Sequence, residues 1–281
     1  MLSSLLFTSF LLLPSDDAVE PDAGRSVVVY KTEPRDLEYE VFLPAEDSSA
    51  KRGGVVFFHG GGWNGGSRGQ FATHCEEIAR RGGVGITVTY RLRSTDGTPA
   101  TACVTDAFDA WCHVLEHAED YGLDPARLAV GGGSAGGHIA ACLGTGTVPP
   151  GYDAAGLQKP RAMVLFNPGV CLGSFEGYEP IKFEDTTAAR VGCEPKLLSP
   201  MHHLDKDTPA TLIMHGTADT TISIQSAALF VQRLQQFGTT GELKRYPGAK
   251  HGFFNRGEAY DQTMQQMLTF LAEQNVLTPE N

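Results

Sequence analysis

The sequence predicts an α/β fold in which a mostly parallel sheet is covered by helices on both faces. Along the 281 residues, short apolar runs rich in β-formers alternate with longer amphipathic runs. This rhythm is typical of repeated strand–helix–strand units. The run 54–58 is apolar throughout, as expected for a strand buried on both faces. With 41% hydrophobic residues, the chain can bury the core of one large domain.

Eight runs are predicted to be strands, and they lie at 27–31, 37–42, 54–58, 84–90, 128–130, 162–166, 210–215 and 242–246. The first two are separated by a turn-like Glu-Pro-Arg-Asp and should form an opening pair. Helices are predicted at 70–80, within 101–119, after Ser134, at 223–237 and at 260–271. The stretch 167–209 has little periodicity, which predicts a lid or substrate-binding insertion in a domain spanning 25–281.

The net charge bears on the expected partners, and the N-terminal residues bear on the expected location of the protein. The net charge is −11 and the pI about 5.2, without any Lys/Arg cluster, so nucleic acid is not an expected partner. The run Leu5–Leu13 is too short to span a bilayer but has the length of a signal-peptide core. Residues 1–24 are therefore predicted to be a signal peptide, and the protein to be secreted or periplasmic. The alternative is a disordered or packed arm on a cytoplasmic protein, because no Lys or Arg precedes Arg25.

The six cysteines do not predict a metal site. None of them shows the close CxxC spacing of zinc or redox motifs. In an exported chain some of them could pair, and Cys171 with Cys193 would cross-link one loop region. In a cytosolic chain all six are expected to be buried small hydrophobic residues.

The stretch VGGGSAGGHIAACLG surrounds Ser134 with five glycines among its six nearest neighbours. The strand at 128–130 precedes this stretch, and a helix is predicted to start just after the serine, so Gly132–Gly136 is a G-x-S-x-G turn from strand to helix. Such a sharp turn strains the central residue and leaves room only for minimal flanking side chains. The hydroxyl is expected to project above the sheet edge beside a helix N-terminus, as a nucleophile requires.

A serine nucleophile needs a base, and the base needs an orienting acid. His251 follows the last predicted strand and is the expected base, whereas His138 lies inside the helix after Ser134 and should point away from it. Asp219 follows the strand at 210–215, at the end of the sheet where parallel sheets bind ligands. Two rival acids precede that strand and should face the opposite end of the sheet, Asp205 and Asp207.

The motif His59-Gly-Gly-Gly-Trp63 follows the strand at 54–58. Glycine allows backbone N–H groups to approach a substrate oxygen closely, so this loop is predicted to supply donors for an oxyanion. The expected donors are the N–H groups of Gly61, Gly62 and Ala135. His59 is expected to organise the loop.

Five motifs, VVFFHGGGW, TYRL, GGGSAGGH, HGTADTT and AKHGFFN, resemble the α/β-hydrolase superfamily of esterases and lipases. The resemblance runs from about Val27 to Leu271 and is nearest to the hormone-sensitive-lipase-like and the feruloyl or acetylxylan esterase-like branches. It implies an α/β-hydrolase catalytic domain with an eight-stranded sheet and a small lid. It also implies that Ser134, Asp219 and His251 act as nucleophile, orienting acid and base, without a metal or cofactor.

The expected substrate is a short acyl ester, first of all an acetyl ester of a carbohydrate such as xylan, with feruloyl esters and general carboxylesters as alternatives. The segment 171–207 is rich in polar residues, and Trp63, Phe175 and Tyr178 are available to stack on sugar rings. Other classes on this fold are serine peptidases and non-catalytic binding proteins. Peptidases usually carry a large extra domain, and binding proteins typically lose the nucleophile or the base. The oligomeric state stays open.

Overall fold

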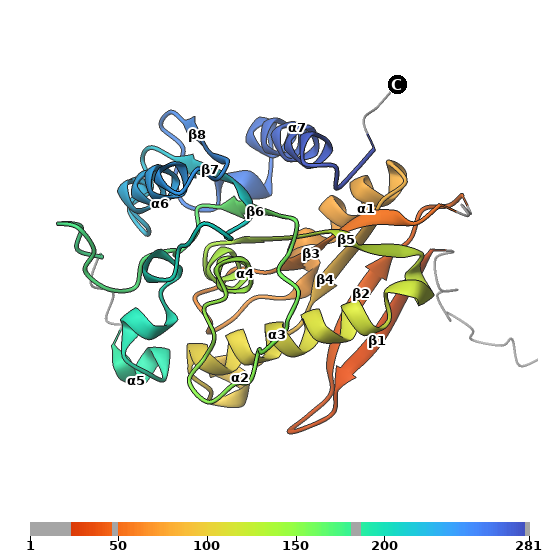
Figure 1. Ribbon diagram of the computed structural model, residues 1–281, viewed down its shortest axis with the longest axis horizontal. Coiled ribbons are helices and arrows are strands. Elements are labelled where there is room, and N and C mark those ends of the chain that lie inside the picture. The colour runs from red at the N-terminus through yellow and green to blue at the C-terminus, as the bar shows by residue number, and fades with distance from the viewer. Residues whose placement is uncertain (1–23, 47–49, 181–186, 279–281) are drawn as a thin grey trace, which may run out of the picture.

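The computed structural model describes residues 24–46, 50–180 and 187–278, so nearly all of the predicted signal peptide lies outside the described residues. The described chain forms one eight-stranded sheet (Figure 1). Its strands are β1 (Arg25–Lys31), β2 (Leu37–Phe42), β3 (Arg52–Phe58), β4 (Val84–Val88), β5 (Leu123–Gly133), β6 (Ala162–Phe166), β7 (Ala210–Gly216) and β8 (Gly241–Tyr246). All eight predicted strands are therefore confirmed.

The strand order is β1-β2-β4-β3-β5-β6-β7-β8. The first strand pairs antiparallel with β2, and β2 pairs antiparallel with β4. Every other neighbouring pair is parallel. The carboxyl ends of β3, β5, β6, β7 and β8 therefore meet along one edge, where the predicted motif loops begin.

The fifth strand starts at Leu123, five residues before the predicted start, because Arg52 pairs with Leu123 across a register shift. The intervening Asp-Pro-Ala-Arg is only partly buried. Its polar residues and proline lack the apolar pattern of a strand, so the extension depends on pairing with β3 rather than on local preference.

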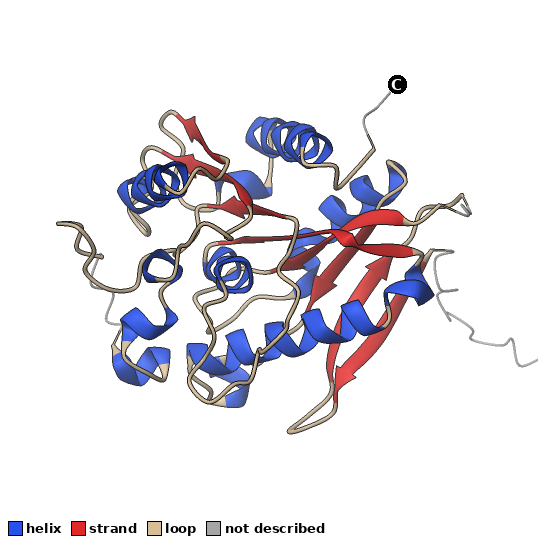
Figure 2. Ribbon diagram, in the orientation of Figure 1, coloured by secondary structure: helices blue, strands red, loops and turns tan. Residues whose placement is uncertain are grey.

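Helices cover both faces of the sheet (Figures 1 and 2). They are α1 (Ala72–Arg80), α2 (Arg93–Asp96), α3 (Ala100–Glu116), α4 (Ala135–Thr145), α5 (Ala188–Val191), α6 (Ile224–Gln236) and α7 (Glu258–Glu273). One apolar core joins α3, α4 and α6 to one face of the sheet. A second core joins α1 and α7 to the other face. The predicted fold class, with helices on both faces, is confirmed.

The insertion 167–209 contains short turns instead of long helices. Besides α5, its described parts hold two single 3₁₀ turns, Pro195–Leu198 and Pro200–His202. Several hydrogen bonds hold this segment in place. Among them, the N–H of Met201 donates to the carbonyl of Val170, and the ring of His138 on α4 bonds the carbonyl of Leu198 at 2.8 Å. The insertion thereby packs beside the carboxyl edge of the sheet.

The six cysteines are free thiols, and Cys75, Cys103, Cys142 and Cys171 are buried. The pairing of Cys171 with Cys193, considered as one possibility for an exported chain, is therefore not formed in this structure. Within the described ranges, every helix is too short or too polar to cross a lipid bilayer.

Candidate active site

Ser134 lies at the corner between β5 and α4, with φ 55° and ψ −116°. A positive φ is strained for a residue with a side chain. The surrounding glycines exist because three backbone segments meet here. A Cβ on Gly136 would lie 2.0 Å from the carbonyl oxygen of Phe58, and one on Gly132 would lie 2.4 Å from the carbonyl oxygen of Gly136. Close contact between strand and helix thus holds the serine in its strained turn.

The structure brings Ser134, His251 and Asp219 together from three separate loops. The Nε2 atom of His251 lies 2.9 Å from Oγ of Ser134, and its Nδ1 atom lies 2.7 Å from Oδ2 of Asp219. A carboxylate can only accept hydrogen bonds, so Nδ1 of His251 carries a proton. Nε2 is then left to accept the serine proton.

The side chain of Asp219 is fully buried and held as a carboxylate. Its Oδ1 accepts hydrogen bonds from the N–H groups of Thr221 at 2.8 Å and Ile222 at 3.0 Å. Burial by itself raises the pKa of this carboxyl, but the hydrogen bonds from His251 and the two backbone N–H groups outweigh burial and lower the pKa below its ordinary value. The acid is therefore ionised beside the imidazole.

The rival acids point elsewhere, as expected. Asp205 lies 3.4 Å from Nζ of Lys159 and accepts a hydrogen bond from the Thr208 hydroxyl. Asp207 pairs with Lys206 at 2.8 Å. His138 is buried under the site, where its ring bonds the insertion instead of Ser134.

The loop after β3 presents free N–H groups. Gly61 and Gly62 have φ values of +116° and +64°, which favour glycine. Neither of their N–H groups donates to any described residue. Ala135 is the first residue of α4, and the N–H groups of a first helical turn have no partner within the helix. Gly62 and Ala135 border the cavity beside Ser134, while Gly61 is not among the residues that line it.

His59 organises this loop. Its ring stacks on that of Tyr90 at a centroid distance of 4.2 Å, and its Nδ1 atom bonds the carbonyl of Gly60 at 2.8 Å. The Tyr90 hydroxyl donates to the carbonyl of His59 at 2.6 Å. Burial lowers the pKa of His59, so the ring is neutral.

Two supporting residues were not predicted. Gln70 accepts a hydrogen bond from the N–H of Gly60 at 2.6 Å. The buried Asn167 has φ 37° and accepts a hydrogen bond from the N–H of Gly252, next to the imidazole, at 3.2 Å. Asn167 directly follows β6 at the edge where the motif loops meet, and this position was a usable signal. Gln70 carries none.

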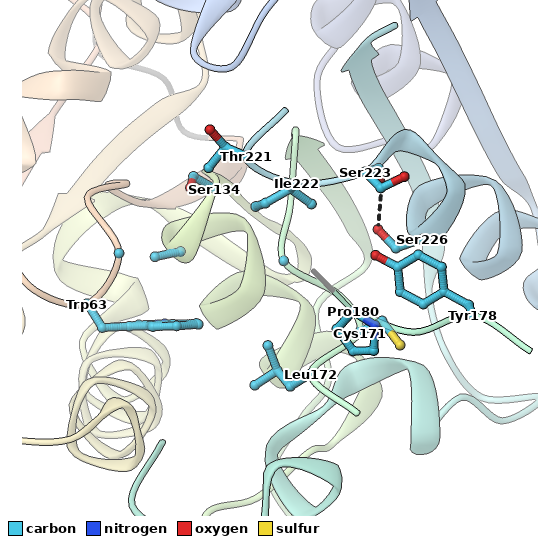
Figure 3. A pocket seen from close by; sticks show the side chains of 13 residues that line it. Trp63, Ser134, Cys171, Leu172, Tyr178, Pro180, Thr221, Ile222, Ser223 and Ser226 are labelled. Atoms are coloured by element: carbon cyan, nitrogen blue, oxygen red, sulfur yellow. Dashed lines mark hydrogen bonds between the residues drawn. The ribbon is translucent and has the colours of Figure 1, made fainter. Parts of the chain in front are cut away.

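Beside Ser134 lies a cavity of about 200 Å³ (Figure 3). In that view Trp63 and Leu172 lie below Ile222, and Tyr178 and Ser226 lie away from Ser134. The lining side chains that sequence reasoning missed are mainly apolar, with three hydroxyls: Cys171, Leu172, Pro180, Thr221, Ile222, Ser223 and Ser226. The insertion thus supplies one wall of the cavity.

Trp63 and Tyr178 line this cavity as predicted, but Phe175 does not. Phe175 and Tyr178 close a tight turn through two backbone hydrogen bonds of 2.9 and 2.8 Å. The turn leaves Phe175 packed edge-on against His202 at 5.3 Å. Phe175 thus lies outside the wall of this cavity, and its role in substrate binding stays a prediction.

A serine bonded to an imidazole, which a buried carboxylate orients beside free N–H groups, has the parts needed for acyl transfer. On a mostly parallel sheet with a strand–serine–helix turn, this arrangement defines the class of α/β hydrolases. A family model described as alpha/beta hydrolase fold matches residues 55–255, and the chain belongs to that family. Its resemblance to the hormone-sensitive-lipase-like esterases is confirmed.

Solved structures and curated relatives agree with this family. The chain is similar to a thermophilic esterase of Thermogutta terrifontis, with a TM-score of 0.83 and 37% identity over 92% of this chain and 95% of that one. The propionate-bound form of that esterase gives a TM-score of 0.82 and 38% identity over 92% of this chain and 97% of that one. Ethyl acetate hydrolase of Pseudomonas putida is 34% identical over 54% of this chain and 46% of its own. The chain spans about half, or less, of the length of the curated relatives it matches.

Proposed function

We propose that the protein is a serine esterase that hydrolyses short-chain acyl esters through an acyl-enzyme. The observation that carries this proposal is the hydrogen-bonded series from Ser134 through His251 to Asp219, which opens on a small cavity. The relatives named as esterases support the reaction class.

The geometry supports the following reaction. His251 takes the hydroxyl proton as Oγ of Ser134 attacks the ester carbonyl carbon, and Asp219 stabilises the imidazolium. The N–H groups of Gly61, Gly62 and Ala135 donate to the negative oxygen that forms. His251 then gives its proton to the leaving alcohol, and water repeats the sequence on the acyl-serine to release the acid.

The size of the cavity supports a short acyl group. Its volume of about 200 Å³ is below the range of about 300–1,000 Å³ that is common for drug-sized ligands. Trp63 and Leu172 are buried to more than nine-tenths and form firm apolar walls. The propionate-bound relative and the ethyl acetate hydrolase support the same substrate size.

Our finer proposal is that the acyl group is an acetyl group on a carbohydrate such as xylan. The lining hydroxyls of Thr221, Ser223 and Ser226 support a hydroxyl-rich ligand, and Trp63 and Tyr178 offer rings for sugars. The apolar walls favour the second candidate, a general carboxylesterase of simple short esters. A feruloyl group is much larger than an acetyl group and fits the small cavity less well.

The test compares wild-type protein with Ser134→Ala. Hydrolysis of nitrophenyl acetate, butyrate, octanoate and ferulate is measured beside acetate release from acetylated xylan. We expect acetate and butyrate to be preferred and the alanine variant to lose several orders of magnitude in turnover. Substantial turnover by folded Ser134→Ala protein would disprove the serine mechanism. If the wild type releases no acetate from acetylated xylan, the carbohydrate proposal fails and a general carboxylesterase of simple short esters remains as the proposed function.

A further inference from the structure

Arg190 is a buried cation on α5, in the insertion, and only 5% of its surface is exposed. Its Nη2 group donates a hydrogen bond to the carbonyl of Gly62 in the loop after β3. Its Nε group is buried and has no hydrogen-bond partner among the residues that the structure describes. Thr187 caps the short helix, its Oγ1 accepting from the backbone N–H of Arg190 at 3.3 Å.

The surroundings of Arg190 differ from those of a structural arginine. Arg91 contacts both carboxylate oxygens of the buried Asp106, at 2.7 and 2.8 Å, so its charge is neutralised. Arg190 forms no ion pair with a described carboxylate. Because burying an unpaired charge is costly, its position calls for an explanation other than core stability.

The contact with Gly62 supplies that explanation. Gly61 and Gly62 both have positive φ values and no side chain of their own that could hold the backbone by packing. On one side, Gln70 holds the N–H of Gly60. On the other side, Arg190 holds the carbonyl of Gly62, and a Cβ placed on Gly62 would lie 3.9 Å from the same nitrogen. The glycine pair is thereby fixed at both ends.

We propose that Arg190 is a positioning residue that holds the Gly62 backbone in the orientation needed to donate to the oxyanion. This inference rests on the proposed esterase function. The insertion then both forms a cavity wall and aligns the donors, so acyl binding and oxyanion stabilisation share one segment. An aligned donor acts mainly in the transition state, so its loss lowers kcat more than it raises KM.

Three variants test this role: Arg190→Met, Arg190→Lys and Lys196→Met. Lysine keeps the charge and a donor nitrogen, whereas methionine keeps only the apolar stem. Lys196 is an exposed cation of the same insertion and serves as the matched control. For each protein we measure kcat and KM with nitrophenyl acetate, the melting temperature, and inhibition by trifluoroacetone. Ser134 adds to this ketone to give a tetrahedral oxyanion.

Loss of a complete oxyanion donor costs about 10²–10³ in kcat, so a misaligned one is expected to cost about 10–100-fold in Arg190→Met. KM should change by less than about threefold, and trifluoroacetone should bind more weakly by the same factor as kcat/KM falls. Arg190→Lys should recover most of the loss. Lys196→Met should match the wild type.

Wild-type kcat and inhibitor affinity in Arg190→Met would overturn the inference while leaving the proposed function intact. A loss of kcat that follows a lowered melting temperature, without recovery in Arg190→Lys, would also overturn it, because Arg190 would then be structural. Absence of Ser134-dependent hydrolysis in the wild type would instead refute the proposed function itself.

Discussion

Asp219 differs from the other candidate acids in its burial and its bonds. Its side chain is fully buried and accepts hydrogen bonds from two backbone N–H groups as well as from the imidazole. Asp219→Asn removes the charge that stabilises the imidazolium and fixes its tautomer, so we expect kcat to fall by about 10³–10⁴. Ester hydrolysis by the purified variant checks this outcome. Asp205→Asn is the control and should keep wild-type kcat, since Asp205 bonds Lys159 and Thr208. The opposite ranking would assign the acid to Asp205.

Leu172 is expected to limit acyl length. It is 6% exposed and lines the cavity beside Trp63. Leu172→Ala should lengthen the cavity, and one methylene in an apolar pocket is worth about 1–3 kcal/mol. The ratio of octanoate to acetate kcat/KM should therefore rise at least about tenfold. Leu197→Ala changes an exposed leucine of the same insertion and should leave the ratio unchanged. An unchanged ratio in Leu172→Ala would place the acyl chain elsewhere.

The turn between β5 and α4 depends on Gly136. In a helix, alanine is favoured over glycine by about 1 kcal/mol. Here a Cβ would lie 2.0 and 2.4 Å from the backbone oxygens of Phe58 and His59, which cannot move without displacing β3. The clash should outweigh propensity, so Gly136→Ala should destabilise the fold by about 3 kcal/mol or more and abolish activity. Urea denaturation measures the change.

Gly144 provides a comparison in the same helix. Its added Cβ would meet the side chain of Met163, which is flexible and can shift. We expect Gly144→Ala to cost much less, within about 1 kcal/mol of the wild type. Equal losses in the two variants would mean that general crowding around α4, instead of the turn, sets the cost.

Local pattern predicted the strands and motif loops because each depends on residues close in sequence. It missed the start of β5, where pairing with β3 extends a polar segment. It also missed Gln70 and Arg190, since their roles arise from contacts with Gly60 and Gly62 across the fold. The cavity walls were predicted only in part, because their residues also meet through contacts between segments far apart in the sequence. The insertion has no periodicity, so the direction of Phe175 depends on a tight turn.

The N-terminal residues lie outside the described residues, and their role stays a proposal from sequence. We propose that the mature protein begins after about residue 18 to 24 and is exported, because Leu5–Leu13 has the length and apolar composition of a signal-peptide core. N-terminal sequencing of the protein from its native cells tests this expectation. An intact Met1 on soluble native protein would favour the cytoplasmic alternative.

Buried neutral histidines should make the whole fold sensitive to acid. His74 packs among Phe71, Phe166 and Tyr260 at centroid distances of 5.0–5.7 Å, and within the described part of the chain neither ring nitrogen has a hydrogen-bond partner. Burial lowers its pKa from 6.5 to about 3. Burial likewise lowers the pKa of His138 to about 4, although its hydrogen bond to Leu198 opposes the shift. In the unfolded chain both would titrate near pH 6.5.

Between those values the unfolded state binds more protons, so stability is lost as pH falls below about 6.5 and the loss levels off near the folded-state pKa. At pH 5 each histidine should cost about 2 kcal/mol relative to pH 7. His74→Phe removes one titrating group from an aromatic site and should reduce the acid-induced loss by that amount. Urea denaturation at several pH values measures it, with His117→Phe, at a partly exposed histidine, as control. Parallel pH curves for wild type and His74→Phe would show that His74 is protonated or solvated in the folded protein.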